Sequence, residues 1–196
     1  MRTTRIRIDT DKPAFKIIEQ VSSCLQSGGI VLYPSDTVYG LLCRADDKES
    51  VERLSTLKGY KERRPFILII DGISMAESLT DEIDPEVREI LLLRWPGRLT
   101  FVLPAGNRCP EWVRGEDNTV ALRHPADPLS NLILSEVKVP LVSTSANLSG
   151  TKPALSLNEI PESILDGADI ILDAGTLPPS SPSTILRLLR SSQGRT

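Results

Sequence analysis

Short apolar runs that alternate with amphipathic segments constrain this chain more than any other feature. Two of them, GIVLYP at residues 29–34 and FILII at residues 66–70, contain no charged side chain. Runs this short and continuous are typical of strands that the fold covers on both faces. The segments between them carry apolar residues at helical spacing, and helices that alternate with strands indicate an α/β fold.

The same patterns predict the remaining elements. Further strands are predicted at residues 99–104, 119–123, 140–145, 168–175 and 183–189. Helices are predicted from Asp11-Lys12-Pro13 to Gly28, around residues 51–57 with an end near Lys58, at residues 84–95 and at residues 129–137. No repeat or linker interrupts the pattern. We therefore predict a single domain over residues 1–196 with a mixed, largely covered sheet, a core at about residues 10–189 and a polar tail at residues 190–196.

The composition excludes several classes of function. With 23 basic and 26 acidic residues the chain has a formal net charge of −3, so any contact with nucleic acid must come from a local basic patch. The opening residues, MRTTRIRIDTDKPAF, lack the apolar core of a secretory signal. No apolar run approaches the roughly 20 residues that a membrane helix needs. We therefore expect a cytoplasmic protein.

The chemistry open to the chain is narrow. It has one histidine, His124, and three scattered cysteines, which disfavours both a zinc site and a hydrolase driven by a histidine base. Neither a P-loop nor a dinucleotide-binding motif is present. We predict no metal site formed by the protein, and chemistry in which Lys, Arg, Asp, Ser and Asn stabilise charge.

The densest basic stretch is LKGYKERRPF at residues 57–66, which places Lys58, Lys61, Arg63 and Arg64 between a helix end and a buried strand. A cation at a helix C-terminus complements the helix dipole, which explains Lys58, and we expect its side chain to be exposed there. Four cations so close together repel one another unless an anion lies among them. The stretch is either a solvated helix end or an anion-binding site.

A polar segment, STSANLSG at residues 143–150, continues the predicted strand that begins with PLV. The hydroxyls of Ser143 and Ser145, the amide of Asn147 and nearby backbone N–H groups could hold a phosphate. The same residues could instead form a capped turn that ends with Gly150 in a left-handed conformation. The sequence alone leaves both interpretations open.

Two further features fall at predicted strand ends. PSDTVYGL at residues 34–41 follows the first buried strand, where Asp36 could cap a turn, and Arg123 closes the strand TVALR. Ligands bind at the carboxyl ends of strands in α/β sheets, so both features could belong to a site. A structural salt bridge is the alternative role for Arg123.

Four segments in this order, PSDTVYGL, LKGYKERRPF, WPGRLTFVLP and VSTSANLSG, resemble the YrdC-like family of threonylcarbamoyl-adenylate synthases, and SPSTILRL resembles the closing strand of that family. The resemblance implies a twisted α/β sheet curled around a concave, positively charged cavity. It also implies a nucleotidyltransferase reaction in which L-threonine, bicarbonate and ATP, with Mg²⁺ on the triphosphate, give threonylcarbamoyl-adenylate (threonylcarbamoyl-AMP) and pyrophosphate. Partner proteins would then transfer the threonylcarbamoyl group to transfer RNA.

The resemblance also assigns roles to individual residues. The catalytic residues that it implies are Lys58, Arg64 and Ser145. The ATP-binding residues that it implies are Lys58, Arg63, Arg64, Ser143, Ser145 and Asn147. The threonine-binding residues that it implies are Ser35, Arg123, Ser143 and Ser183. Within this last set, Arg123 is the expected partner of the threonine carboxylate, because arginine binds carboxylates through two parallel hydrogen bonds.

Three positions depart from the family's motifs. Tyr60 stands where the family has the arginine of a Lys-x-Arg motif, Asp127 stands where a histidine is expected, and Ser35 replaces a threonine. Losing one charge-assisted contact would cost about 2–3 kcal/mol and slow the reaction by roughly one to two orders of magnitude. Two alternatives to the synthase follow. One is a protein of this fold that binds nucleotides or RNA, double-stranded RNA included, with weak or no activity. The other is an enzyme that adenylates a different amino acid.

Overall fold

The computed structural model describes residues 3–62, 64–180 and 183–187, and within these ranges nine strands form one mixed sheet in the order β1-β8-β2-β3-β7-β4-β6-β5-β9. The strands are β1 (Thr4–Arg7), β2 (Val31–Pro34), β3 (Tyr39–Arg44), β4 (Ile67–Ile69), β5 (Leu99–Pro104), β6 (Thr119–Arg123), β7 (Leu141–Ser145), β8 (Ile170–Asp173) and β9 (Thr184–Arg187). The helices are α1 (Phe15–Gln26), α2 (Lys48–Leu57), α3 (Ile73–Leu79), α4 (Pro85–Arg94), α5 (Pro128–Val137) and α6 (Glu162–Gly167), with 3₁₀ turns η1 (Glu111–Val113) and η2 (Leu157–Glu159).

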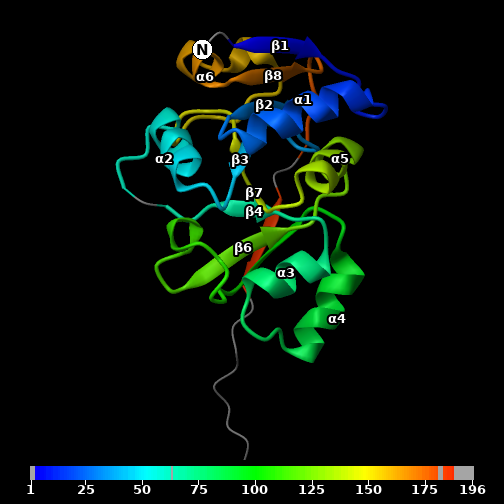
Figure 1. Cartoon of the computed structure of the whole chain (residues 1–196), viewed down its shortest axis with the longest axis vertical. Helices are drawn as coiled ribbons and strands as arrows, with labels where there is room; N and C mark the ends of the chain where they lie inside the picture. Colours follow the sequence, from blue (N-terminus) through cyan, green and yellow to red (C-terminus); the bar gives the residue numbers. More distant parts are fainter. Residues whose placement is uncertain (1–2, 63, 181–182, 188–196) are drawn as a thin grey trace, which may run out of the picture.

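The strand directions decide where the ends of the strands meet. Strands β2, β3, β7 and β4 pair antiparallel in turn, whereas β4 and β6 are parallel. The carboxyl ends of β2 and β7 therefore share one edge of the sheet, and β6 ends at the other edge. In Figure 1 the sheet descends along the long axis, from β1 and β8 at the top to β4 and β6 above α3 and α4.

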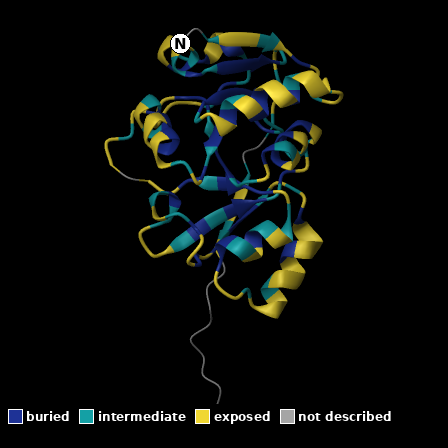
Figure 2. Ribbon diagram, in the orientation of Figure 1, coloured by how far each residue is buried: buried dark blue, intermediate teal, exposed yellow. Residues whose placement is uncertain are grey.

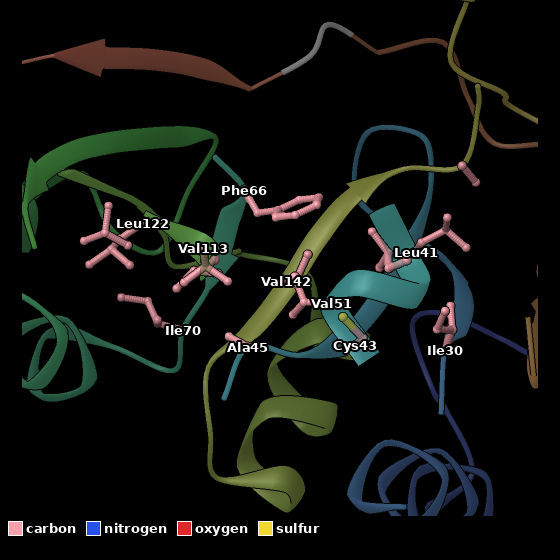
Figure 3. Packing of buried hydrophobic residues seen from close by; sticks show 14 of the residues in the cluster. Ile30, Leu41, Cys43, Ala45, Val51, Phe66, Ile70, Val113, Leu122 and Val142 are labelled. Atoms are coloured by element: carbon pink, nitrogen blue, oxygen red, sulfur yellow. The ribbon is translucent and has the colours of Figure 1, made fainter. Parts of the chain in front are cut away.

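Each face of the sheet buries its own apolar core, because successive side chains of a strand point to opposite faces. On one face, Leu32, Leu41 and Val142 belong to a cluster that α2, α3, α4 and α6 cover. Figure 3 shows Leu41 and Val142 within this cluster. On the other face, Tyr33 and Leu42 belong to a second cluster, which α1 and α5 complete.

The α/β class and the mixed sheet are confirmed, and every predicted strand is present within the described residues. Residues 188–196, which include the end of the last predicted strand and the polar tail, lie outside them. The first helix starts at Phe15 rather than near Asp11, because the carboxylate of Asp9 accepts the backbone N–H groups of Asp11 and Lys12 in a turn that precedes it.

Several helices and strands were not predicted from the sequence patterns. Strand β1 lies before the predicted core and carries an exposed, polar pattern, because it is an edge strand that pairs only with β8. Strand β3 begins inside PSDTVYGL, where Gly40 is required because a Cβ there would lie 2.9 Å from the ring of Tyr33. Helix α3 follows Gly72, which has no side chain to cap it, so the sequence lacks the usual signal of a helix start there. Within the described ranges, no helix combines the length and apolarity needed to cross a membrane.

Candidate functional site

A cavity of about 360 Å³ opens on the sheet face that carries the second cluster. Helix α1 covers this face over β2 and β3 and contacts α5, and residues of β4, β6 and β7 that line the cavity lie on the same face. Figure 2 shows buried strands running through the centre of the molecule, between helices whose outer surfaces are exposed. The described residues that line the cavity are Tyr33, Ser35, Thr37, Val38, Gly40, Tyr60, Pro65, Phe66, Ile67, Ile69, Arg123, Ser143, Thr144, Ser145, Pro153, Ser183 and Ile185.

All four predicted threonine-binding residues line this one cavity. Ser35 comes from the loop between β2 and β3, Arg123 from the end of β6, Ser143 from β7, and Ser183 from the residue before β9. Their sequence positions span 149 residues, from 35 to 183, so only the curled sheet brings them together. Ser183 is also within 3.4 Å of the Thr100 hydroxyl, which donates a hydrogen bond to it.

Ser35 stabilises its own loop. Its Oγ accepts hydrogen bonds from the backbone N–H groups of Thr37 and Val38, each at 3.2 Å, and donates one to the Val38 carbonyl at 2.7 Å. The loop is also tied to a distant segment, because Ser180 donates its hydroxyl to the Thr37 carbonyl at 2.7 Å. A Ser or Thr in such a turn replaces backbone hydrogen bonds with its own, so this wall of the cavity is preorganised.

Arg123 forms the salt bridge that the sequence left as one of two options, and it lines the cavity as well. Its Nη2 donates to Asp36 Oδ2 at 2.5 Å and its Nε donates to the Gly97 carbonyl at 3.1 Å. Among the described lining residues Arg123 is the sole cation, and Asp36 balances it. The lining is therefore less basic than the resemblance implied. The expectation that Arg123 shares the carboxyl-end edge of the sheet with the other site residues is wrong. Strand β6 runs opposite to β7, so Arg123, at the carboxyl end of β6, reaches the cavity from the other edge of the sheet.

Lys58 is buried, which contradicts the expectation of an exposed helix end. Its side chain is 2% exposed, and its Nζ donates to the carbonyls of Ser145 and Asn147 at 2.5 Å each and to Asn147 Oδ1 at 3.1 Å. Burial lowers the pKa of Lys58 to about 8, so the amine remains mostly protonated at neutral pH. The cation lies behind the cavity wall and joins helix α2 to the end of β7.

The segment STSANLSG combines features of the two interpretations, because serines at the end of β7 line the cavity and the residues after β7 form a turn held by hydrogen bonds. The amide of Asn147 donates to the Thr151 and Leu148 carbonyls, and its Oδ1 accepts from Lys58 and from the Ser145 hydroxyl. Gly150 has a φ of 82°, the left-handed conformation that was predicted. Ser143 and Ser145 line the cavity, whereas Asn147 is buried and occupied by the turn.

The remaining predicted nucleotide-binding residues lie at the rim or outside the described chain. Arg64 lines an adjoining groove of about 650 Å³, which shares Phe66 and Ile67 with the main cavity. Arg63 lies outside the described residues. Tyr60 lines the cavity, with its ring 6.0 Å from that of Phe66 and 5.4 Å from the Arg64 guanidinium carbon. The face of a tyrosine ring attracts a cation at this distance. Tyr60 therefore orients the guanidinium of Arg64 but supplies no positive charge of its own.

Sequence reasoning missed Tyr33 and the role of Asp127. Tyr33 is 2% exposed, lines the cavity, and places its hydroxyl 3.1 Å from Ser143 Oγ; burial raises its pKa, so it stays a neutral phenol. Tyr33 lies in an apolar run, so the sequence pattern gave no sign that its hydroxyl faces a cavity.

Asp127 caps helix α5, because its carboxylate accepts the Ser130 backbone N–H at 2.8 Å. Across the described ranges, no three His, Cys, Asp or Glu side chains are grouped so as to hold a metal ion.

Replacing Asp127 with asparagine is expected to stabilise the protein at neutral pH. Burial raises the pKa of Asp127, so folding favours its protonated form and the ionised carboxylate costs stability above that pKa. Asparagine keeps the oxygen that caps α5 and carries no charge. Urea unfolding at several pH values should show an advantage of Asp127→Asn at pH 7 that shrinks as the pH falls through the pKa of Asp127.

A second capping aspartate provides a control of opposite sign. Asp47 caps α2, and its hydrogen bonds from Ser50 lower its pKa, so its charge stabilises the fold above the unfolded pKa. Asp47→Asn should therefore lose stability at pH 7 and recover relative to the wild type in acid. The same pH dependence for both variants would contradict the assignment of Asp127.

The fold and the cavity together define an α/β protein with a candidate ligand site on one sheet face, which the described residues line with hydroxyls and one paired arginine. A family model described as "Telomere recombination" and named for Sua5, YciO and YrdC matches residues 23–195. The chain belongs to this family, as the four sequence motifs predicted.

Curated relatives carry one recurring name. "Threonylcarbamoyl-AMP synthase" of Coxiella burnetii (strain RSA 493 / Nine Mile phase I) is 33% identical over 168 residues, which cover 86% of this chain and 90% of the relative. The protein of that name from Marinobacter nauticus is 30% identical over 188 residues, which cover 95% and 99%. These names agree with the predicted synthase activity.

Solved structures support the same conclusion for the fold. P. abyssi Sua5, complexed with L-threonine, superposes with a TM-score of 0.85 at 29% identity. That match covers 96% of this chain but 54% of the Sua5 chain, so this protein spans about half of that relative. E. coli YciO also gives a TM-score of 0.85, at 26% identity, with 95% and 90% covered.

Proposed function

We propose that this protein is a threonylcarbamoyl-AMP synthase, which converts L-threonine, bicarbonate and ATP into threonylcarbamoyl-AMP and pyrophosphate. The observation that carries the proposal is the convergence of Ser35, Arg123, Ser143 and Ser183 on one cavity. Its volume of about 360 Å³ falls within the range of small-molecule sites. The curated relatives share the activity in their names.

The chemistry suits a site with no histidine base. The threonine amine and bicarbonate condense to a carbamate and release water. A carbamate oxygen then attacks the α-phosphorus of ATP, and the bond between that phosphorus and the pyrophosphate oxygen breaks. Such transfers depend on alignment and on neutralisation of charge rather than on a proton shuttle. The ordered hydroxyls and Arg123 can align the amino acid, and Mg²⁺ arrives as part of the nucleotide substrate.

We place threonine in the main cavity and extend ATP into the adjoining groove. In this arrangement Arg123 binds the threonine carboxylate, while the hydroxyls of Ser143 and Ser145 lie where the two substrates meet. Arg64 meets the phosphates from the groove, oriented by the ring of Tyr60. Lys58 contributes through its positive charge and through the turn that it holds in place.

The substitutions at Tyr60 and Asp127, which favoured a binding protein without turnover, have structural explanations. Tyr60 packs beside Phe66 and Arg64, and Asp127 caps α5. Asp127 does not line the cavity, whereas Tyr60 lines it and places an aromatic ring, next to Arg64, where the family has an arginine. We extend the proposal to the cytoplasm, where partner proteins would pass the threonylcarbamoyl group to transfer RNA.

Replacing Arg64 with alanine is expected to raise the KM for ATP about fivefold to tenfold while leaving the KM for threonine unchanged. The reason is the loss of one exposed charge-assisted contact to a phosphate. Lys61→Ala is the matched control, since Lys61 is an exposed cation of the same stretch and lines neither cavity. Equal effects of the two substitutions would show that only the general charge of the stretch matters.

The experiment that tests the function is pyrophosphate release from ATP by the purified protein with Mg²⁺, with threonine or bicarbonate omitted in turn. Release that requires both establishes the synthase. Release with a different amino acid would identify an enzyme of altered specificity. Binding of RNA that weakens with salt, in the absence of any turnover, would identify a binding protein instead.

A further inference from the structure

Asp36 stands directly behind the wall of the main cavity. It does not line that cavity, although Ser35 and Thr37 on either side of it do. It lines instead a separate cavity of about 240 Å³ on the other side of the loop. Its side chain is 13% exposed, so it acts on the site through its neighbours rather than on a substrate.

Asp36 contacts two arginines from two different segments. Its Oδ2 accepts from Arg123 Nη2 at 2.5 Å and lies 3.8 Å from Arg98 Nε. Its backbone carbonyl also accepts from Arg98 Nη2 at 3.1 Å. Of the two, Arg123 is buried and reaches the main cavity, whereas the side chain of Arg98 is 54% exposed.

These contacts leave a defined part of Arg123 free for a ligand. A guanidinium has five N–H groups. One of these, on Nε, is taken by the Gly97 carbonyl, and another, on Nη2, is taken by Asp36. Among the described residues, the two N–H groups of Nη1 and the second of Nη2 have no hydrogen-bond partner, so three donors remain for a carboxylate.

We propose that Asp36 is a positioning residue for substrate binding, which fixes Arg123 so that the free end of its guanidinium faces the carboxylate of the amino-acid substrate. The proposal rests on the proposed function, because it takes that carboxylate to be the ligand. The loop suits this role, since Ser35 locks it internally and Ser180 ties it to a distant segment. A carboxylate carried on a rigid loop reduces the rotamer freedom that Arg123 would otherwise lose on binding.

The test compares Asp36→Asn and Asp36→Glu with the wild type by steady-state pyrophosphate release and by calorimetric titration with L-threonine alone. Asp36→Asn is expected to weaken threonine binding and raise the KM for threonine about fivefold, with the KM for ATP and the kcat unchanged. Asp36→Glu restores a carboxylate and should recover part of the loss. Asp46→Asn is the matched control, because Asp46 pairs with Arg44 at 2.7 Å on the surface, away from both cavities.

The outcomes separate the two proposals. A wild-type protein that binds no threonine overturns the proposed function, and the role of Asp36 with it. A wild-type protein that binds threonine, with Asp36→Asn equal to the Asp46→Asn control, overturns the positioning role alone. An equal rise in both KM values, together with a lower unfolding temperature for Asp36→Asn and no recovery in Asp36→Glu, would show that Asp36 only maintains the fold.

Discussion

Replacing Lys58 with methionine is expected to destabilise the protein by about 3 kcal/mol, even without substrates. Methionine fills a similar volume but takes a charged donor away from three acceptors on Ser145 and Asn147. Asn147 Oδ1 and the Ser145 carbonyl keep a second donor, whereas the buried Asn147 carbonyl loses the one that it has among the described residues. An unsatisfied buried acceptor costs about 1–3 kcal/mol. For a chain of this size the melting temperature should fall by about 6–12 °C, as circular dichroism or calorimetry would measure.

Lys48→Met is the matched control for this experiment. Lys48 begins the same helix and its side chain is 61% exposed; within the described part of the chain its ion-pair partner is Glu52, at 3.6 Å. A surface pair of this kind contributes about 0–1 kcal/mol. If Lys58→Met melts at the same temperature as Lys48→Met, then the buried ammonium does not hold the turn after β7.

Replacing Arg123 with methionine is expected to produce the largest loss of function, with a rise of about 100-fold in the KM for threonine. The substitution removes the sole cation among the described residues of the cavity lining, and a charge-assisted hydrogen bond contributes about 1.5–3 kcal/mol. It also leaves the carboxylate of Asp36 without its buried partner, which turns a neutral pair into a net negative charge beside the site. Pyrophosphate release at varied threonine and fixed ATP measures the effect.

Arg98→Met is the control for the loss of a cation beside Asp36. Arg98 contacts the same aspartate, but it is 54% exposed and does not line the cavity. We expect at most a twofold to fivefold change in the KM for threonine, as for an exposed ion pair. Comparable effects of Arg98→Met and Arg123→Met would mean that general charge, and not a direct contact, attracts the substrate.

Elements with strong local signals could be predicted from the sequence. The run GIVLYP became β2 with every residue buried, and DPEVREILLLRW became α4 with Asp84 as its cap. Elements stabilised by their neighbours could not. Strand β1 is held by pairing with β8 and by the ion pair of Arg5 with Asp173, and both partners lie more than 160 residues away.

The candidate site, too, could be predicted only in part from the sequence. The motifs and the family resemblance identified Ser35, Arg123, Ser143 and Ser183, and the structure gathers all four around one cavity. The exposure of Lys58 was predicted wrongly, because a helix end looks solvated until another segment covers it. Tyr33 was missed, since an aromatic residue in an apolar strand carries no local sign of facing a cavity.

The sequence by itself determined the α/β class, the family and the chemical inventory: hydroxyls, lysines and arginines at strand ends, without a histidine base. These depend on local periodicity and on residue type, which a chain carries in any conformation. The tertiary structure alone decided how those groups are used. In the folded protein Lys58 is buried behind the wall of the main cavity, and Arg123 reaches that cavity from the sheet edge opposite to the carboxyl ends of β2 and β7. It also set Asp36 against Arg123 across 87 residues of sequence. Burial, strand direction and long-range ion pairs arise only when the sheet curls, and they determine which charges a ligand meets.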